Sequence, residues 1–318
     1  MVDKPIIAIT GARGHVGGRL LKHFCTNTRT HIRPNFRTTL DMPEWITRCT
    51  PIFGDLHEPS TRRELLGNSD VVVHLATRGY SSARQPSSSQ LDEEYSVTTE
   101  LIRDSVTLGI STFIFVSSIH VLGKALASQV TEATTPLLSN EYGRSKLRLE
   151  MELLNQCTGT KMTPIVLRMA NAFGVPAFPQ AATWNLLVHD LCRQAVTSDQ
   201  LVLNSNGTGY RNILTLRDAT SAIAQVATLR IPAGTYLLTG PRTYQLHEIA
   251  ELVRSRAETV LDKSLTVVRN ENDSSSHESF TLHPTSLNAF GIPVGNHLIE
   301  EVDELLNAAN LEFSGSKL

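Results

Sequence analysis

The sequence predicts an α/β fold: a doubly wound parallel sheet followed by a smaller C-terminal α/β lobe. Apolar or β-branched runs alternate with helical patterns over the first half of the 318-residue chain. A glycine turn opens the first helix, and the alternation weakens after Arg168. At about 150 residues per domain, the length corresponds to roughly two domains.

The first half supplies the strands of the expected sheet. Pro5–Thr10 is a β-branched run, and a helical stretch follows it from Val16 to about Asn27. Asp70–Leu75 is a continuous apolar run, which is typical of a strand buried on both faces. Further strands are expected at His31–Arg37, Thr112–Ser117 and Thr163–Arg168, and helices at Leu91–Leu108 and Leu137–Gln156.

The second half is less regular. We expect Arg211–Thr228 to form a strand and a helix that return to the sheet. The dinucleotide-binding domain is therefore predicted to comprise residues 1–168 with 211–230, and the smaller lobe residues 169–210 and 231–318. Within the lobe, helices are expected at Leu246–Leu261 and Leu298–Ala308, and Ser81–Gln90 and Asn270–Ser279 are expected to be loops.

Composition excludes several classes of protein. Apolar residues make up 41% of the chain and charged residues 19%, which suffices for a sizeable core, and the net charge of −2 argues against a nucleic-acid-binding protein. No apolar run approaches the ~20 residues that span a bilayer, and the N-terminus lacks a basic leader, so we expect a soluble cytoplasmic protein without membrane contact. The cysteines (Cys25, Cys49, Cys157 and Cys192) have no paired spacing, which predicts reduced, mostly buried thiols and no bound metal.

The glycine turn Thr10–Gly17 predicts a Rossmann-type dinucleotide site. Gly11 permits the tight turn, Gly14 lets the backbone approach a pyrophosphate, and Gly17 allows close helix packing. The first turn of the helix offers free N–H groups to phosphate. We therefore expect the turn, including Arg13, His15 and Val16, to bind the cofactor.

The end of the second strand predicts which cofactor binds. An acidic residue there would bind the ribose 2′-OH of NAD, whereas arginine accommodates the 2′-phosphate of NADP. Residues 30–38 contain no acid, and Arg33, Arg37 and, from the glycine turn, Arg13 are candidates for the phosphate. Three solvated arginines are the alternative interpretation. We predict NADP, with Arg37 nearest the expected strand end and NAD as the alternative.

Tyr142 and Lys146 form a candidate catalytic pair. They are four residues apart on a predicted helix, hence on one face. A free tyrosine has a pKa of about 10, and a neighbouring ammonium stabilises the phenolate and lowers that value. Ser117 and Ser118 lie at the carboxyl end of a predicted strand, where open α/β sheets bind ligands.

With these motifs the chain resembles the extended short-chain dehydrogenases/reductases of the nucleotide-sugar epimerase/dehydratase type. The resemblance implies that Ser118 polarises the substrate oxygen, Tyr142 exchanges its proton, and Lys146 lowers the tyrosine pKa and holds the nicotinamide ribose. It places Asp55 and Leu56 at the adenine end and Leu75 and Ala76 beside the cofactor. It also implies a substrate-binding lobe and a homodimer formed through two helices per subunit. The motifs that carry the resemblance are Thr10–Gly17, Gly54–Leu56, His74–Ala76, Ser117–Gly123, Tyr142–Lys146, Leu167–Gly174 and Arg211–Asp218.

The same resemblance points to a nucleotide-sugar substrate. The segment between Asn171 and Arg211 should line its site, and Asn171 and Arg211 themselves are expected to bind the substrate. Arg211 is the expected diphosphate partner because its fork suits phosphate oxygens. Ser118 and His120 would also contact the substrate, although a histidine at this place is as often a supporting hydrogen-bonding group. Trp184 is expected in the core rather than as a stacking platform.

Three departures from the family pattern stand out. The usual Val-Tyr-Gly is Val121-Leu122-Gly123, and the asparagine often found on the helix before the serine strand is replaced, by register, by Glu94 or Ser96. Ile119-His120 stands where 4,6-dehydratases carry an acidic pair, which disfavours dehydration.

The favoured function is therefore an NAD(P)-dependent oxidoreductase acting at C4 of a nucleoside-diphosphate hexose, as a 4-ketoreductase or a 4-epimerase. A reductase of a non-sugar aldehyde or ketone is the second interpretation, against which Arg211 argues. A non-catalytic dinucleotide sensor is the third, and such proteins typically lose the tyrosine–lysine pair that this chain retains.

Overall fold

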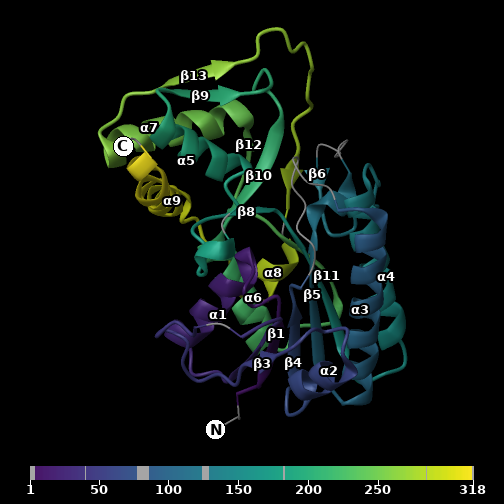
Figure 1. The fold of residues 1–318 in the computed structure, drawn as a ribbon. Coiled ribbons are helices and arrows are strands. Elements are labelled where there is room, and N and C mark those ends of the chain that lie inside the picture. The colour runs from purple at the N-terminus through teal and green to yellow at the C-terminus, as the bar shows by residue number, and fades with distance from the viewer. Residues whose placement is uncertain are drawn as a thin grey trace.

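The computed structural model describes residues 4–39, 41–76, 86–123, 129–181, 183–283 and 285–316. The predicted fold class is confirmed: within these ranges, seven parallel strands form one sheet in the order β11-β7-β5-β4-β1-β2-β3 (Figure 1). The strands are β1 (Ile7–Thr10), β2 (Ile32–Phe36), β3 (Ile52–Phe53), β4 (Val71–His74), β5 (Thr112–Ser118), β7 (Thr163–Met169) and β11 (Gly234–Leu238).

Helices cover both faces of this sheet (Figure 1). On one face α1 (His15–Asn27) packs beside α6 (Leu216–Thr228). The other face carries α2 (Pro59–Leu66), α3 (Ser88–Thr107) and α4 (Glu141–Cys157). This two-sided cover explains why the strands read as continuous apolar runs.

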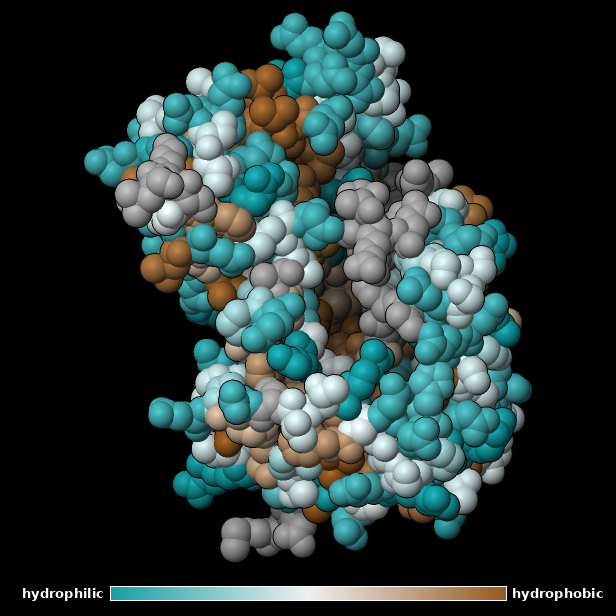
Figure 2. Space-filling view, viewed as in Figure 1, coloured by the Kyte–Doolittle hydropathy of each residue, from teal (hydrophilic) through white to brown (hydrophobic). Residues whose placement is uncertain are grey.

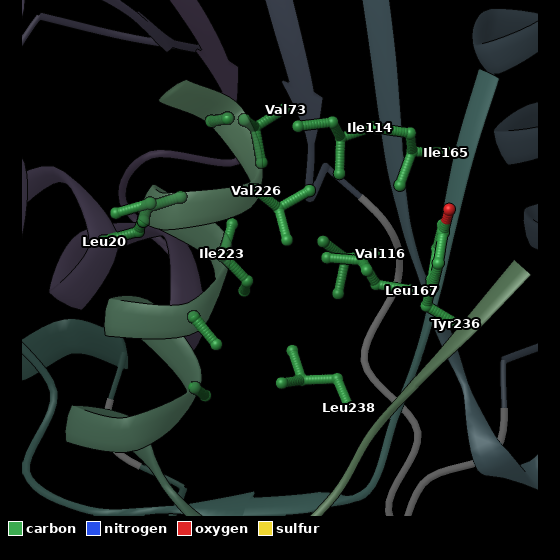
Figure 3. Close-up of a cluster of buried hydrophobic side chains, with 14 of the residues drawn as sticks. Leu20, Val73, Ile114, Val116, Ile165, Leu167, Ile223, Val226, Tyr236 and Leu238 are labelled. Atoms are coloured by element: carbon green, nitrogen blue, oxygen red, sulfur yellow. The ribbon is translucent and has the colours of Figure 1, made fainter. Parts of the chain in front are cut away.

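Along each strand, alternate side chains pack into two separate apolar cores, one on each face of the sheet. Ile114 and Val116 of β5 point toward Ile223 and Val226 of α6, in the same apolar core as Leu20 of α1 (Figure 3). Phe113, also from β5, points the other way and packs in the core beneath α3 and α4. This alternation follows from the two-residue period of a strand.

The smaller lobe has its own core. In the described chain its sheets are the three-stranded β12-β10-β8 and the two-stranded β13-β9. Its elements are β8 (Asn171–Phe173), α5 (Leu187–Thr197), β9 (Gln200–Leu203), β10 (Tyr210–Thr215), β12 (Thr243–Gln245), α7 (Leu246–Leu261), β13 (Thr266–Arg269) and α9 (Leu298–Phe313). Short elements complete the chain: η1 (Ile119–Leu122), β6 (Gln129–Val130), η2 (Pro179–Ala181), β14 (Thr281–Leu282), α8 (Thr285–Ala289) and η3 (Ser314–Ser316).

Two helix boundaries differ from expectation because of side-chain caps. Helix α4 begins at Glu141 rather than at Leu137, since the Asn140 side chain accepts the Gly143 N–H at 2.7 Å. Helix α3 begins at Ser88, inside the segment expected to be a loop, because Ser87 and Gln90 form a capping box. Residues 81–85 of that expected loop lie outside the described residues.

The return of the chain after Arg211 also differs from expectation. Helix α6 packs on α1, but β10 pairs with β8 and β12 instead of joining the large sheet. Strand β11, from the range predicted for the lobe, pairs with β7 and forms the edge of the large sheet. The exact division into two domains stays a prediction. No helix of the described chain is long and apolar enough to cross a membrane.

Candidate active site

A cavity of about 890 Å³ lies at the carboxyl edge of the large sheet. Strand β1 pairs with β2 on one side and β4 on the other, so the chain reverses direction along the sheet here, as at the ligand-binding crevice of open α/β sheets. Figure 2 shows the molecule hollowed between the lobe and the sheet domain, with apolar residues at the bottom of the hollow. The described wall includes Gly11, Arg13, Gly14, His15, Val16, Gly17, Leu75, Val116, Ser117, Ser118, His120, Tyr142, Met169–Phe173, Gln180, Ala181, Thr183, Asn185–Val188, Arg211 and Ile213.

The glycine turn has the geometry that phosphate binding requires. Gly11 has a φ of 67°, and a Cβ at Gly17 would come within 2.2 Å of the Gly11 carbonyl oxygen, so both positions need glycine. Gly14 is the N-cap of α1 and provides no side-chain cap. The first N–H groups of the helix are therefore left for a ligand anion at the cavity wall.

Two side chains of this turn carry buried polar atoms. Neither ring nitrogen of His15, nor Nε of Arg13, has a hydrogen-bond partner of good geometry among the described residues. Burial, followed by His189 and Arg19, lowers the pKa of His15 to about 3, so its ring is neutral. Buried polar atoms without a well-formed hydrogen bond, next to an uncapped helix terminus, fit a bound dinucleotide pyrophosphate.

Beneath the turn, a buried histidine ties three elements together. Thr10 Oγ1 accepts the N–H groups of Leu75 and Ala76, each at 3.1 Å, so its own hydrogen is free to reach His74 Nδ1 at 2.7 Å. Nδ1 is then an acceptor, and Nε2–H donates to Thr98 Oγ1 at 3.0 Å. The ring thus fixes the ends of β1 and β4 against α3.

The three proposed catalytic residues come from β5 and α4. Ser118 ends β5, is 8% exposed, and its Oγ accepts the His120 N–H at 3.2 Å. Tyr142 is part-buried on the cavity wall in the first turn of α4, and Lys146 Nζ lies 5.3 Å from the centroid of its ring. Lys146 is 1% exposed, and its Nζ donates to Glu94 Oε1 at 2.7 Å. Of the two residues left open by sequence, Glu94 therefore faces the lysine.

The proposed substrate residues surround the far part of the cavity. The His120 ring lies edge-on to that of Tyr142, with 5.9 Å between centroids, and burial followed by Arg211 lowers the pKa of His120. Arg211 is an exposed residue of the cavity wall and donates to the Tyr210 carbonyl at 2.8 Å. Asn171 donates to the Asn212 carbonyl at 3.0 Å.

Several predicted cofactor residues lie outside the wall of the cavity among the described residues. Arg37 directly follows β2, is 76% exposed, and its Nε lies 3.4 Å from Asp55 Oδ2. Arg33 donates to the carbonyls of Glu64 and Leu65, so it serves the packing of α2. Leu56 is buried in the core beneath α3. Their contacts with a cofactor remain predictions.

The segment from Gln180 to Val188 supplies wall residues that sequence reasoning did not single out. Gln180, Thr183 and Asn185 face the cavity from a stretch without helical or strand periodicity. The resemblance marked the whole region, and of the residues from 180 to 188 only Trp184 was considered by name. Trp184 packs against the lobe core, as expected, and its Nε1–H donates to Glu312 at 2.9 Å.

Comparison with known proteins places the chain in a family. The model of the NAD dependent epimerase/dehydratase family matches residues 7–237. The chain belongs to this family. A UDP-glucose 4-epimerase of Vibrio cholerae is 23% identical over 173 residues, which are 53% of this chain and 52% of that protein, so the match spans about half of the relative.

Solved structures share the fold over almost the whole chain. A UDP-N-acetylglucosamine 4-epimerase from Methanobrevibacter ruminantium, in complex with UDP-N-acetylmuramic acid, has a TM-score of 0.82 at 17% identity and covers 98% of this chain and 100% of its own. A UDP-glucuronic acid 4-epimerase from Bacillus cereus, in complex with NAD, has a TM-score of 0.79 at 17% identity and covers 98% of each chain.

The buried histidine predicts a pH dependence of stability. Burial, with a smaller effect of Lys146, lowers the pKa of His74 to about 3, whereas the unfolded chain takes up this proton near 6.5. The contribution of His74 to the free energy of unfolding is therefore fully present above about pH 6.5. It is lost as the pH drops toward the folded pKa, by up to about 1.4 kcal/mol per pH unit for one proton. We expect His74→Gln to reduce the slope of unfolding free energy between pH 6 and pH 4, measured by urea denaturation. Above pH 7.5 the slopes of both proteins should agree, and equal slopes between pH 6 and 4 would contradict a neutral His74.

Proposed function

We propose that this family member oxidises and reduces C4 of a nucleoside-diphosphate hexose through Ser118, Tyr142 and Lys146. One observation carries the proposal: the glycine turn, Ser118, Tyr142 and Arg211 all line the same cavity. A dinucleotide at the turn and a nucleotide sugar at Arg211 would therefore meet at the serine and the tyrosine. A bound nicotinamide would supply the hydride acceptor and donor.

The chain's own residues would accept the proton of the substrate hydroxyl and hydrogen-bond its oxygen. The Tyr142 oxygen takes the proton of the substrate hydroxyl, and the Ser118 hydroxyl donates a hydrogen bond to the oxygen that becomes a carbonyl. The Lys146 ammonium, 5.3 Å from the tyrosine ring, stabilises negative charge on the phenol oxygen. Apolar wall residues such as Val116 and Met169 keep bulk water away from these groups.

Arg211 and Asn171 support a nucleotide-sugar substrate. Arg211 of β10 places a fork of donors on the cavity wall, which suits a second diphosphate. The first turn of α5 has no side-chain cap and also lines the cavity. The related epimerases that act on UDP-sugars agree with this class of substrate.

A 4-epimerase and a 4-ketoreductase would share this machinery. The epimerase alternative is supported by the structural neighbours, several of which hold NAD. The reductase alternative is supported by β2, which ends at Phe36 and is followed by Arg37 instead of an acidic residue. An arginine there favours NADP, whose reduced form such reductases consume.

Replacing Tyr142 tests the assigned chemistry. We expect Tyr142→Phe to lower turnover of nucleotide sugars by about 10²- to 10⁴-fold, because the proton acceptor is lost while the ring still packs. Dinucleotide affinity, measured by fluorescence titration, should stay nearly the same. Tyr95→Phe is the matched control, since that hydroxyl bonds to Glu152 on the outer side of α3 and α4. Wild-type turnover in Tyr142→Phe would overturn the proposal.

Replacing Arg37 tests the cofactor assignment. We expect Arg37→Ala to weaken NADPH binding by about tenfold and to change NADH binding little, because a charge-assisted hydrogen bond to the 2′-phosphate is removed. Arg29→Ala, an exposed arginine after α1, should change neither affinity. Equal losses for NADPH and NADH, or no loss, would contradict a role for Arg37 in selecting NADP.

We also propose a homodimer formed through α3 and α4. These helices lie side by side, and the exposed side chains of Leu108, Met151 and Leu154 follow them. Sedimentation velocity should give the mass of a dimer that shifts to a monomer in Met151→Glu. A monomeric wild-type protein at micromolar concentration would contradict this arrangement.

A further inference from the structure

A buried carboxylate lies directly beside the proposed catalytic lysine. Glu94 Oε1 is 2.7 Å from Lys146 Nζ, and their side chains are 3% and 2% exposed. The resemblance to related enzymes leads one to expect a neutral asparagine at this place in α3. This chain instead has a carboxylate there, which forms a buried ion pair with the Lys146 ammonium.

The other titratable groups described around Glu94 add no further unpaired negative charge. His74, next along the same buried layer, is neutral because burial and Lys146 lower its pKa to about 3. On the cavity wall, burial and Arg211 likewise lower the pKa of His120. Glu150, two turns along α4 from Tyr142, is engaged by Arg168.

We propose that the Glu94 carboxylate sets the balance between oxidised and reduced nicotinamide in the cavity. The proposal rests on the proposed function, because it needs the nicotinamide to lie near Ser118 and Tyr142. The oxidised ring carries a positive charge and the reduced ring is neutral. Lys146 carries its ammonium in either case, so a carboxylate at position 94 in place of a neutral amide adds negative potential at the ring and favours the oxidised form.

The strength of this effect depends on burial. In water the interaction between two charges is strongly weakened, whereas at an effective dielectric constant of about 20 it extends over several ångströms. Lys146 Nζ lies 5.3 Å from the ring centroid of Tyr142, which lines the cavity, so the carboxylate is one ammonium group away from the reacting region. Its near-complete burial keeps solvent from screening it.

This charge has a consequence for the reaction. When the oxidised cofactor is favoured, hydride returns readily from the reduced ring to the keto sugar. The keto intermediate then stays at low occupancy, which reduces its escape before the second hydride transfer. Glu94 thus positions the Lys146 ammonium and changes the electrostatic potential in the cavity, without itself touching the substrate.

The experiment compares the affinities of oxidised and reduced dinucleotides. Dissociation constants for NAD and NADH, and for NADP and NADPH, are measured by calorimetry for wild type, Glu94→Gln and Glu94→Asp. We divide the dissociation constant of the reduced dinucleotide by that of the oxidised one. Glu94→Gln should weaken binding of the oxidised form, so we expect this ratio to fall by about fivefold or more. Glu94→Asp keeps the charge and should keep the ratio within about twofold of wild type, by the same electrostatic argument.

Glu93→Gln is the matched control. It removes the same charge one residue away, but its side chain is 44% exposed and pairs with His57, so solvent screens it. An unchanged ratio in Glu94→Gln, or an equal change in Glu93→Gln, would overturn the inference. If Glu94→Gln does not fold, Glu94→Asn provides the neutral side chain and the same criterion applies. A wild-type protein that binds none of the four dinucleotides would instead overturn the proposed function.

Discussion

The position of helix α4 on the sheet depends on a buried ion pair. Arg168 of β7 donates to Glu150 of α4 through Nη2 at 2.8 Å and through Nε, and Ser117 of β5 donates to the same carboxylate at 2.5 Å. Removing one partner of such a pair typically costs about 3–5 kcal/mol, so the contact holds the helix in one rotational setting. Tyr142, Lys146 and Glu150 follow each other at intervals of four residues, and the setting that buries Glu150 therefore turns Tyr142 toward the cavity.

A second set of contacts holds the lobe over the cavity. Arg19 of α1 lies 2.9 Å from the buried carboxylate of Glu301 in α9, and burial raises the pKa of that carboxyl group. Asp218 of α6 bonds to His297 at the start of α9 at 2.5 Å. The helix that follows the glycine turn and the last helix of the lobe are thus joined directly, which ties the lobe to the sheet domain.

Local motifs could be recognised from the sequence, whereas long-range pairings could not. The glycine turn and the Tyr142–Lys146 pair are set by spacing within one turn of chain or helix, so their elements were predicted correctly. The partners of β10 are chosen by contacts between segments more than 25 residues apart, and no local pattern records them. Glu94 and Ser96 could not be separated without the packing of α3 on α4. Gln180, Thr183 and Asn185 face the cavity because of the lobe around them, and no local pattern marks these residues.

The central claim is that hydride leaves and returns at C4 of a nucleotide sugar held against Ser118 and Tyr142. The most direct measurement uses a nucleoside-diphosphate hexose with deuterium at C4 and follows the label by NMR and mass spectrometry. The account predicts a primary isotope effect on turnover, with deuterium either returned to C4 of the epimer or transferred to the nicotinamide. Turnover without an isotope effect, or chemistry at another carbon with the C4 label untouched, would contradict it.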